Sequence, residues 1–163
     1  MRGMRSLVPA ALLASAFCAC SGNGLESFGA HLPDIQLVMP SSGEMGPSLA
    51  SCPTEKCLTV VVAPWCPVCH SVTENIKAVR GYLKAAGVTS RVVVGLSPDS
   101  NALKQYAEEF GPDAQIDLAR VLKPSGVPAF IVSDRGGKVL KTVAGFPGNA
   151  ESSPALASAL GLP

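Results

Sequence analysis

The sequence predicts an α/β fold in which helices pack on a sheet with parallel central strands. Residues 58–63 form a continuous, largely β-branched apolar run, as expected of a strand buried on both faces. An amphipathic helical pattern follows directly, and a second buried run at residues 91–96 comes after it. Because strand–helix–strand crossovers are right-handed and return in the same direction, we expect these two strands to be parallel.

Length and composition support one globular domain. The chain has 163 residues, of which 47% are hydrophobic and 15% charged, a mix that can fill a core and that excludes wholesale disorder. Thirteen Lys and Arg against twelve Asp and Glu leave a net charge of +1. No basic patch interleaved with aromatic residues is present, so we expect no nucleic-acid partner.

The first residues have the pattern of a secretory signal peptide. Arg2 and Arg5 precede a short run of apolar and small residues, 7–20, which is too short for a membrane span of about 20 apolar residues. An uncleaved N-terminal anchor is the alternative. The run ends in Phe-Cys-Ala-Cys, which resembles a bacterial lipobox with Cys20 as the lipidated residue. We therefore expect a lipid-anchored protein on the periplasmic or cell-surface side of a bacterial membrane. The expected boundaries are a lipoprotein signal peptide at 1–19, a tether at 20–31 and a folded domain at 32–163.

The elements of the domain follow from local patterns. We expect a short edge strand at 34–38 and a Gly/Ser/Pro-rich loop at 40–51 before the strand at 58–63, which ends at Pro64. The next helix has apolar residues at helical spacing and a C-capping glycine, which are Val72, Ile76, Val79, Leu83 and Gly87.

A second helix is expected after the strand at 91–96. Ser100 is its predicted cap and Gly111 ends it. Its apolar face comprises Leu103, Tyr106, Ala107 and Phe110. A further short helix is expected near 118–122.

The C-terminal part predicts a hairpin and a last helix. Residues 127–132 are apolar and β-prone, and Asp-Arg-Gly-Gly at 134–137 is a turn signal that leads into a strand at 138–144. Ser153 and Pro154 are typical of the N-cap and first position of a helix.

The segment Trp-Cys-Pro-Val-Cys-His at 65–70 joins the first buried strand to the helix. Cys66 stands at the helix start, where unpaired N–H groups and the helix dipole stabilise a thiolate, the reactive form of cysteine. We expect Cys66 to be an exposed nucleophile that attacks a partner disulfide, and Cys69, one turn later, to resolve the mixed disulfide. A Cys-x-x-Cys pair at a strand-to-helix junction favours this redox role over a purely structural disulfide.

This segment, together with Gly-Val-Pro at 126–128, resembles the thioredoxin superfamily. Two further segments are similar to membrane-tethered TlpA/ResA-like thiol–disulfide oxidoreductases. His-Leu-Pro-Asp-Ile-Gln-Leu at 31–37 resembles their N-terminal segment, and residues 126–137 resemble their strand and hairpin. The resemblance covers roughly residues 31–162.

The resemblance implies a thioredoxin-like fold, with a central mixed sheet flanked by helices and a short N-terminal extension. It implies that Pro128 is a cis proline facing the cysteine pair and that Val127 offers its backbone to an extended substrate. Trp65, beside the nucleophile, is expected to form part of the rim on which a partner docks. The implied partners are protein thiols or disulfides and an upstream redox partner, with no cofactor and no metal required. By analogy, the resemblance points to cysteines of apocytochromes, hence cytochrome c biogenesis, or of copper sites.

The chain departs from the thioredoxin pattern at two places. Thioredoxins carry a buried Asp in the strand before the motif, whereas residues 60–62 are all valine. Residues 67–68 are Pro-Val instead of Gly-Pro, and this dipeptide tunes the reduction potential.

A second cysteine pair, Cys52 and Cys57, lies just before the core strand. Without Cys18 and Cys20 four cysteines remain, which allow three pairings. We expect 52–57 and 66–69. The first is interpreted as a loop staple in an oxidising compartment, and the alternative is a relay that passes electrons to Cys66.

Two other classes of function use the same residues. Cys-Pro-Val-Cys-His is also the attachment pattern for a c-type haem, with His70 as an axial ligand. All four Met residues lie before the motif, and the preceding strand and Pro128 argue against this interpretation. Four cysteines are also enough for a zinc site by number, but the two pairs flank a buried strand. The spacing does not match a copper chaperone.

Overall fold

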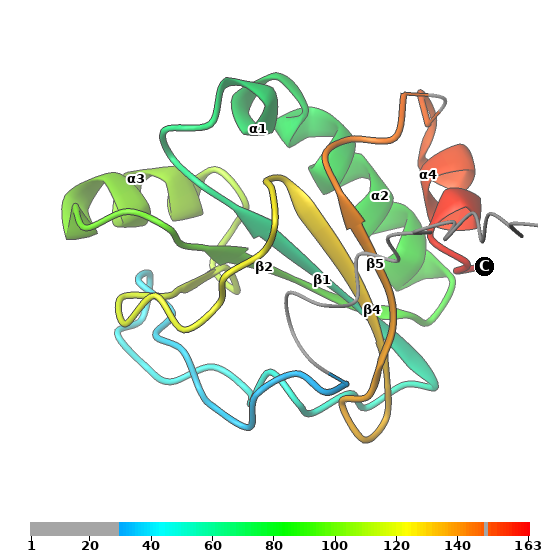
Figure 1. Cartoon of the computed structure of the whole chain (residues 1–163), viewed down its shortest axis with the longest axis horizontal. Helices are drawn as coiled ribbons and strands as arrows, with labels where there is room; N and C mark the ends of the chain where they lie inside the picture. Colours follow the sequence, from blue (N-terminus) through cyan, green and yellow to red (C-terminus); the bar gives the residue numbers. More distant parts are fainter. Residues whose placement is uncertain (1–29, 149) are drawn as a thin grey trace, which may run out of the picture.

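The computed structural model describes residues 30–148 and 150–163 (Figure 1). The expected signal peptide, Cys20 and most of the tether lie outside the described residues. Five strands form one mixed sheet in the order β3-β2-β1-β4-β5. The strands are β1 (Lys56–Val62), β2 (Thr89–Val94), β3 (Gln115–Ile116), β4 (Ala129–Asp134) and β5 (Val139–Ala144). The helices are α1 (Pro67–Ser71), α2 (Thr73–Ala85), α3 (Ser100–Glu108) and α4 (Ser153–Ala159).

Strand β1 is the centre of the sheet. It pairs in parallel with β2, where Val61 lies opposite Val93, and antiparallel with β4, where Val61 lies opposite Ala129. Every residue of β1 after Lys56 is buried, which explains why the strand has no polar alternation. The predicted α/β class, the mixed sheet and the parallel pairing of its central strands are confirmed.

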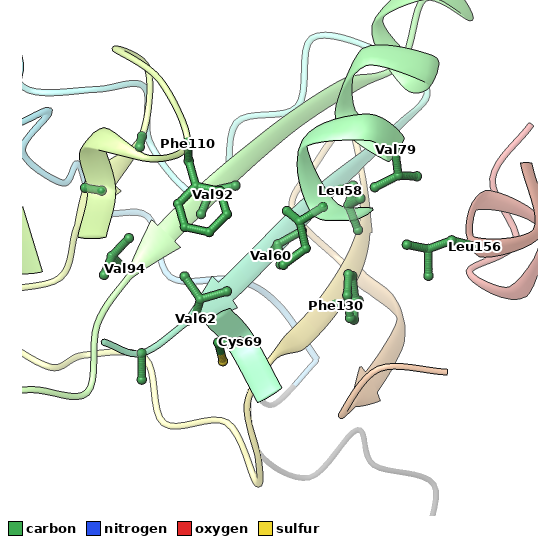
Figure 2. Close-up of a cluster of buried hydrophobic side chains, with 14 of the residues drawn as sticks. Leu58, Val60, Val62, Cys69, Val79, Val92, Val94, Phe110, Phe130 and Leu156 are labelled. Carbon is green, nitrogen blue, oxygen red and sulfur yellow. The ribbon is translucent and has the colours of Figure 1, made fainter. Parts of the chain in front are cut away.

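The two faces of the sheet are covered differently. Helices α2, α3 and α4 contribute to the core on the face that carries Leu58, Val60 and Val62. Figure 2 shows side chains from β1, β2, β4 and the helices gathered in this core. On the opposite face, Leu37 and Leu49 of the N-terminal segment pack with β1, β2 and β4. This segment is the blue-to-cyan chain in Figure 1.

The expected edge strand at 34–38 is wrong. Val38 makes only isolated bridges, to Met45 and Ile116, and the N–H of Ile35 bonds to the Pro33 carbonyl in a local turn. The apolar residues of this segment serve instead to cover the sheet.

The expected helix near 118–122 is also wrong. Residues 115–116 form the edge strand β3, and the chain then turns around the carboxylate of Asp117, which is fully buried. Its oxygens accept hydrogen bonds from the N–H groups of Val121 (3.0 Å) and Leu122 (2.8 Å). Arg120 has a φ of 54°, a left-handed conformation that a helix does not contain.

The helix that starts within the cysteine motif is divided in two. Val72 separates α1 from α2 with φ −109° and ψ 9°. The N-cap residues of α3 and α4 lie one position earlier in the chain than expected. Asp99 caps α3 and Ser152 caps α4. None of the helices in the described part of the chain has the length and apolar character of a membrane span.

Arg91 of β2 connects the sheet to the N-terminal segment by hydrogen bonds. It is 5% exposed, and its guanidinium donates to the carbonyls of Ser48 (2.7 Å) and Ser51. Burial lowers the pKa of this guanidinium. A cation inside the fold thus depends on backbone carbonyls for its partners.

We predict that Asp117→Ala lowers the free energy of unfolding by about 2 kcal/mol, because two backbone N–H groups lose their acceptor inside the fold. Urea denaturation measures this change. The control is Glu108→Ala on an exposed helix position, which we expect to stay within about 0.5 kcal/mol of the parent. Equal stability of the Asp117 variant and the parent would contradict the assigned role of this carboxylate.

Candidate active site

Cys66 caps the first turn of α1. Strand β1 ends at Val62, Pro64 and Trp65 turn the chain, and Cys66 takes an extended conformation with φ −91° and ψ 108°. Its Sγ accepts a hydrogen bond from the N–H of Cys69 at 3.1 Å. A serine or aspartate oxygen usually fills this capping position, and here a sulfur atom does. The contact favours negative charge on that sulfur.

The second contact of Cys66 comes from the loop before β4. Its thiol donates to the carbonyl of Val127 at 3.5 Å, and the Val127–Pro128 peptide bond is cis. Because β4 runs antiparallel to β1, the start of β4 lies beside the end of β1, and Val127 thereby reaches Cys66. The expectation of an exposed Cys66 is wrong: the residue is only 4% exposed, because these contacts enclose its sulfur.

Cys69 lies one turn further inside. It is fully buried, and burial raises the pKa of its thiol to about 12. The hydrogen bond to Cys66 and the charge of Cys66 act in the same direction. Cys69 is therefore a protonated thiol at neutral pH, which suits a group that reacts second.

A polar cluster lies beside Cys69. Thr73 Oγ1 donates to the Cys69 carbonyl at 3.1 Å and lies 3.2 Å from the Tyr106 hydroxyl. Burial raises the pKa of Tyr106 to about 12, so its hydroxyl stays protonated. The Tyr106 ring lies 4.3 Å from the ring of His70, whose Nε2 bonds to the Pro64 carbonyl at 2.7 Å. Helical spacing assigned Tyr106 to the core, and no sequence signal connected it with the cysteines.

The rim of the site is apolar and open. Trp65 is 60% exposed, and its Nε1 donates to the Leu96 carbonyl at 2.7 Å. Val68, between the two cysteines, is 48% exposed. The structure therefore places Cys66 in contact with Cys69 and Val127, with Trp65 directly before it in the chain.

Several solved structures with this architecture are described as thiol-exchange proteins. Similar structures include a thio-disulfide isomerase from Thermus thermophilus, with 26% identity and a TM-score of 0.56 over 81% of this chain and 93% of that one. A DsbE-type thiol:disulfide interchange protein from Chlorobium tepidum has 20% identity and a TM-score of 0.60, with 81% and 96% covered. An exposed lipoprotein thioredoxin from Streptococcus pneumoniae has 19% identity and a TM-score of 0.59, with 79% and 98% covered. The chain has the fold of the thioredoxin superfamily. No protein-family model and no curated protein matches the sequence.

In this thioredoxin-like fold, Cys52 and Cys57 form a disulfide at the far end of β1. The strand separates this disulfide from the end of β1 at which Cys66 lies. Five residue steps from Cys57 to Val62, at about 3.3 Å each, span about 17 Å. Thiol–disulfide exchange needs direct sulfur contact. The relay interpretation is therefore excluded for one molecule in this conformation, and the disulfide closes the loop before β1.

The cysteines of the motif are free thiols in this structure and do not form the expected 66–69 disulfide. Within residues 30–148 and 150–163 no group of three His, Cys, Asp or Glu side chains is placed to hold a metal. A haem attached through this motif would need a thioether bond to each sulfur, but Cys69 is fully buried. His70 is also engaged with Pro64 and Tyr106.

We predict that iodoacetamide distinguishes the two thiols of the reduced protein. Below about pH 9 Cys69 stays protonated, because its pKa is raised to about 12, so only Cys66 is alkylated at an appreciable rate. Peptide mass spectrometry over a pH series measures both sites, and the urea-unfolded protein, in which both react, is the control. Equal alkylation of the folded pair at neutral pH would contradict this assignment.

We predict that the double variant Cys52→Ala, Cys57→Ala keeps its thiol-exchange turnover but loses about 2 kcal/mol of stability, because only the cross-link is removed. Turnover and urea denaturation are measured on the same preparation. A loss of turnover in the still folded variant would restore the relay interpretation.

Proposed function

We propose that this protein is an extracytoplasmic thiol–disulfide oxidoreductase that exchanges disulfides with protein partners through Cys66 and Cys69. The observation that carries the proposal is the position of Cys66 Sγ, 3.1 Å from the N–H of Cys69 and 3.5 Å from the carbonyl of Val127. The first contact stabilises a thiolate. The second supplies a backbone acceptor at the place where an extended substrate chain would lie.

The reaction proceeds in two exchanges when the protein acts as a reductant. The Cys66 thiolate attacks a substrate disulfide, a Cys66–substrate disulfide forms, and one substrate thiolate leaves. That thiolate takes the Cys69 proton, and the Cys69 thiolate attacks Cys66 Sγ. The second substrate thiolate leaves and takes a proton from water. Two electrons have passed to the substrate, and Cys66 and Cys69 are joined by a disulfide.

An upstream dithiol partner returns the pair to the reduced form by the same two exchanges in reverse order. By analogy, the TlpA/ResA resemblance points to the cysteines of apocytochromes, hence cytochrome c biogenesis, or to those of copper sites as downstream partners. The buried Cys69 needs a base at the second exchange, and β1 offers no carboxylate at residues 60–62. The substrate thiolate released in the first exchange is the group best able to accept that proton.

The proposed location rests on the N-terminal pattern and on similar proteins. The signal peptide at 1–19 would direct export, and the lipidated Cys20 and the tether would hold the domain on the outer side of a membrane. One similar structure is a secreted disulfide oxidoreductase from Mycobacterium tuberculosis, and another is described as an exposed lipoprotein. The Cys52–Cys57 disulfide also suits an oxidising compartment.

We predict that Cys66→Ser abolishes the reduction of insulin, because no thiolate remains to attack. In Cys69→Ser the first exchange continues but resolution fails, so a covalent adduct with substrate accumulates on non-reducing gels. Turbidity with dithiothreitol as electron donor measures the first effect. Full activity of Cys66→Ser, or adducts formed through Cys69 in that variant, would overturn the assignment of roles.

A further inference from the structure

Exposed apolar side chains lie in the cysteine motif and in the loop after β3. Seven large hydrophobic residues are exposed in the described part of the chain. Four of them lie in two short segments, 65–68 and 118–121, and these are Trp65, Val68, Leu118 and Val121. Contiguous exposed apolar surface marks an interaction site, and the two segments meet at a groove that Trp65 and Ala119 line.

A groove of about 480 Å³ lies where these two segments meet. It is lined by Trp65, Leu96, Ala119, Arg120 and Lys123. Trp65 directly precedes Cys66, so the groove lies beside the reacting cysteine.

The charge of the groove has one sign. Arg120 and Lys123 are its charged residues, and no carboxylate lines it. The ion pairs among residues 30–148 and 150–163 are Lys77–Glu74 and Arg80–Asp113, so neither groove cation is neutralised there. The whole chain has a net charge of only +1, so the positive charge of the groove is a feature of this part of the surface and not of the whole protein.

The walls of the groove are fixed in unusual backbone conformations. Leu96 and Arg120 are the non-glycine residues with positive φ in the described chain, at 61° and 54°, and both line the groove. The Leu96 carbonyl is held by Trp65 Nε1, and the Arg120 turn is held by the Asp117 carboxylate. Left-handed conformations are unfavourable for these residues and persist where the surroundings enforce them. The groove is therefore pre-shaped before a partner binds.

We propose that this groove selects polypeptide substrates that carry an acidic residue close to the reacting cysteine. The proposal rests on the proposed thiol–disulfide exchange at Cys66. The substrate's apolar residues would pack on Trp65, and its carboxylate would pair with Arg120 and Lys123. The chemistry of the exchange is unchanged, and the groove alters which partner reaches Cys66 and how fast.

The test uses two symmetric peptide disulfides that differ only in the residues beside cysteine, Glu in one and Lys in the other. Single-turnover rates with the full-length reduced protein are measured by acid quench and mass spectrometry. We expect the acidic peptide to react about tenfold faster at low salt and the ratio to approach one at high salt, as charge steering is screened. Using the ratio cancels any general loss of thiol reactivity.

The deciding variant is Arg120→Glu with Lys123→Glu, which should bring the ratio below one. The matched control, Lys84→Glu with Lys138→Glu, changes the net charge equally at exposed positions of α2 and of the β4–β5 hairpin, and should keep the parent ratio. Both groove residues are exposed, and Arg120→Gln with Lys123→Gln provides a milder second variant whose ratio should approach one.

Each outcome has a distinct meaning. Reduction of neither peptide by the parent protein would overturn the proposed function itself. Reduction of both at equal rates, or the same ratio change in the control, would overturn the groove proposal and leave the function standing. Sedimentation with phosphatidylglycerol vesicles that depends on Arg120 and Lys123, without peptide selection, would assign the groove to anionic lipid instead.

Discussion

The hydrogen bond from the N–H of Cys69 to the sulfur of Cys66 is the interaction on which the proposed chemistry depends. It exists because β1 is buried along its length, which fixes the position of the chain where this central strand ends. Pro64 ends the strand there, and Pro67 starts the helix with a residue that has no N–H to satisfy. A cysteine sulfur in the capping position then accepts a hydrogen bond from a backbone N–H, which a cysteine on an ordinary surface would lack.

The same arrangement makes the two cysteines unequal. Cys66 caps the helix start and contacts the Val127 carbonyl, whereas Cys69 is enclosed by the helix and the core. Burial raises the pKa of Cys69 to about 12, so the order of reaction is built into the fold. The buried Asp of thioredoxins would lower the barrier for Cys69, and the valines at 60–62 provide no such group. Resolution therefore relies on the base that the substrate itself releases.

The sequence predicted the elements whose patterns are local and long. The buried run of β1, the Asp-Arg-Gly-Gly turn and the cysteine pair at the helix start all lie where their patterns indicate. The cap of α3 was one residue off, since both Asp99 and Ser100 are good capping residues. The turn at Asp117 could not be predicted, because the carboxylate competes with helix formation only once β3 has fixed its position. The burial of Arg91 likewise depends on carbonyls that lie about forty residues earlier in the chain.

The strands of the sheet position the cysteines, whereas loops form the proposed groove. Substrate selectivity can therefore change without a change in the geometry of the cysteine site. The antiparallel pairing of β1 with β4 sets the distance between Cys66 and Val127, and changing it would require a shift of strand register. The proposed groove instead joins Trp65 to the loops after β2 and β3. Side chains on such loops can change without altering the core, provided that Asp117 still holds the turn. Charge at positions 120 and 123 is thus free to be selected for a partner, while the geometry of the cysteines is not.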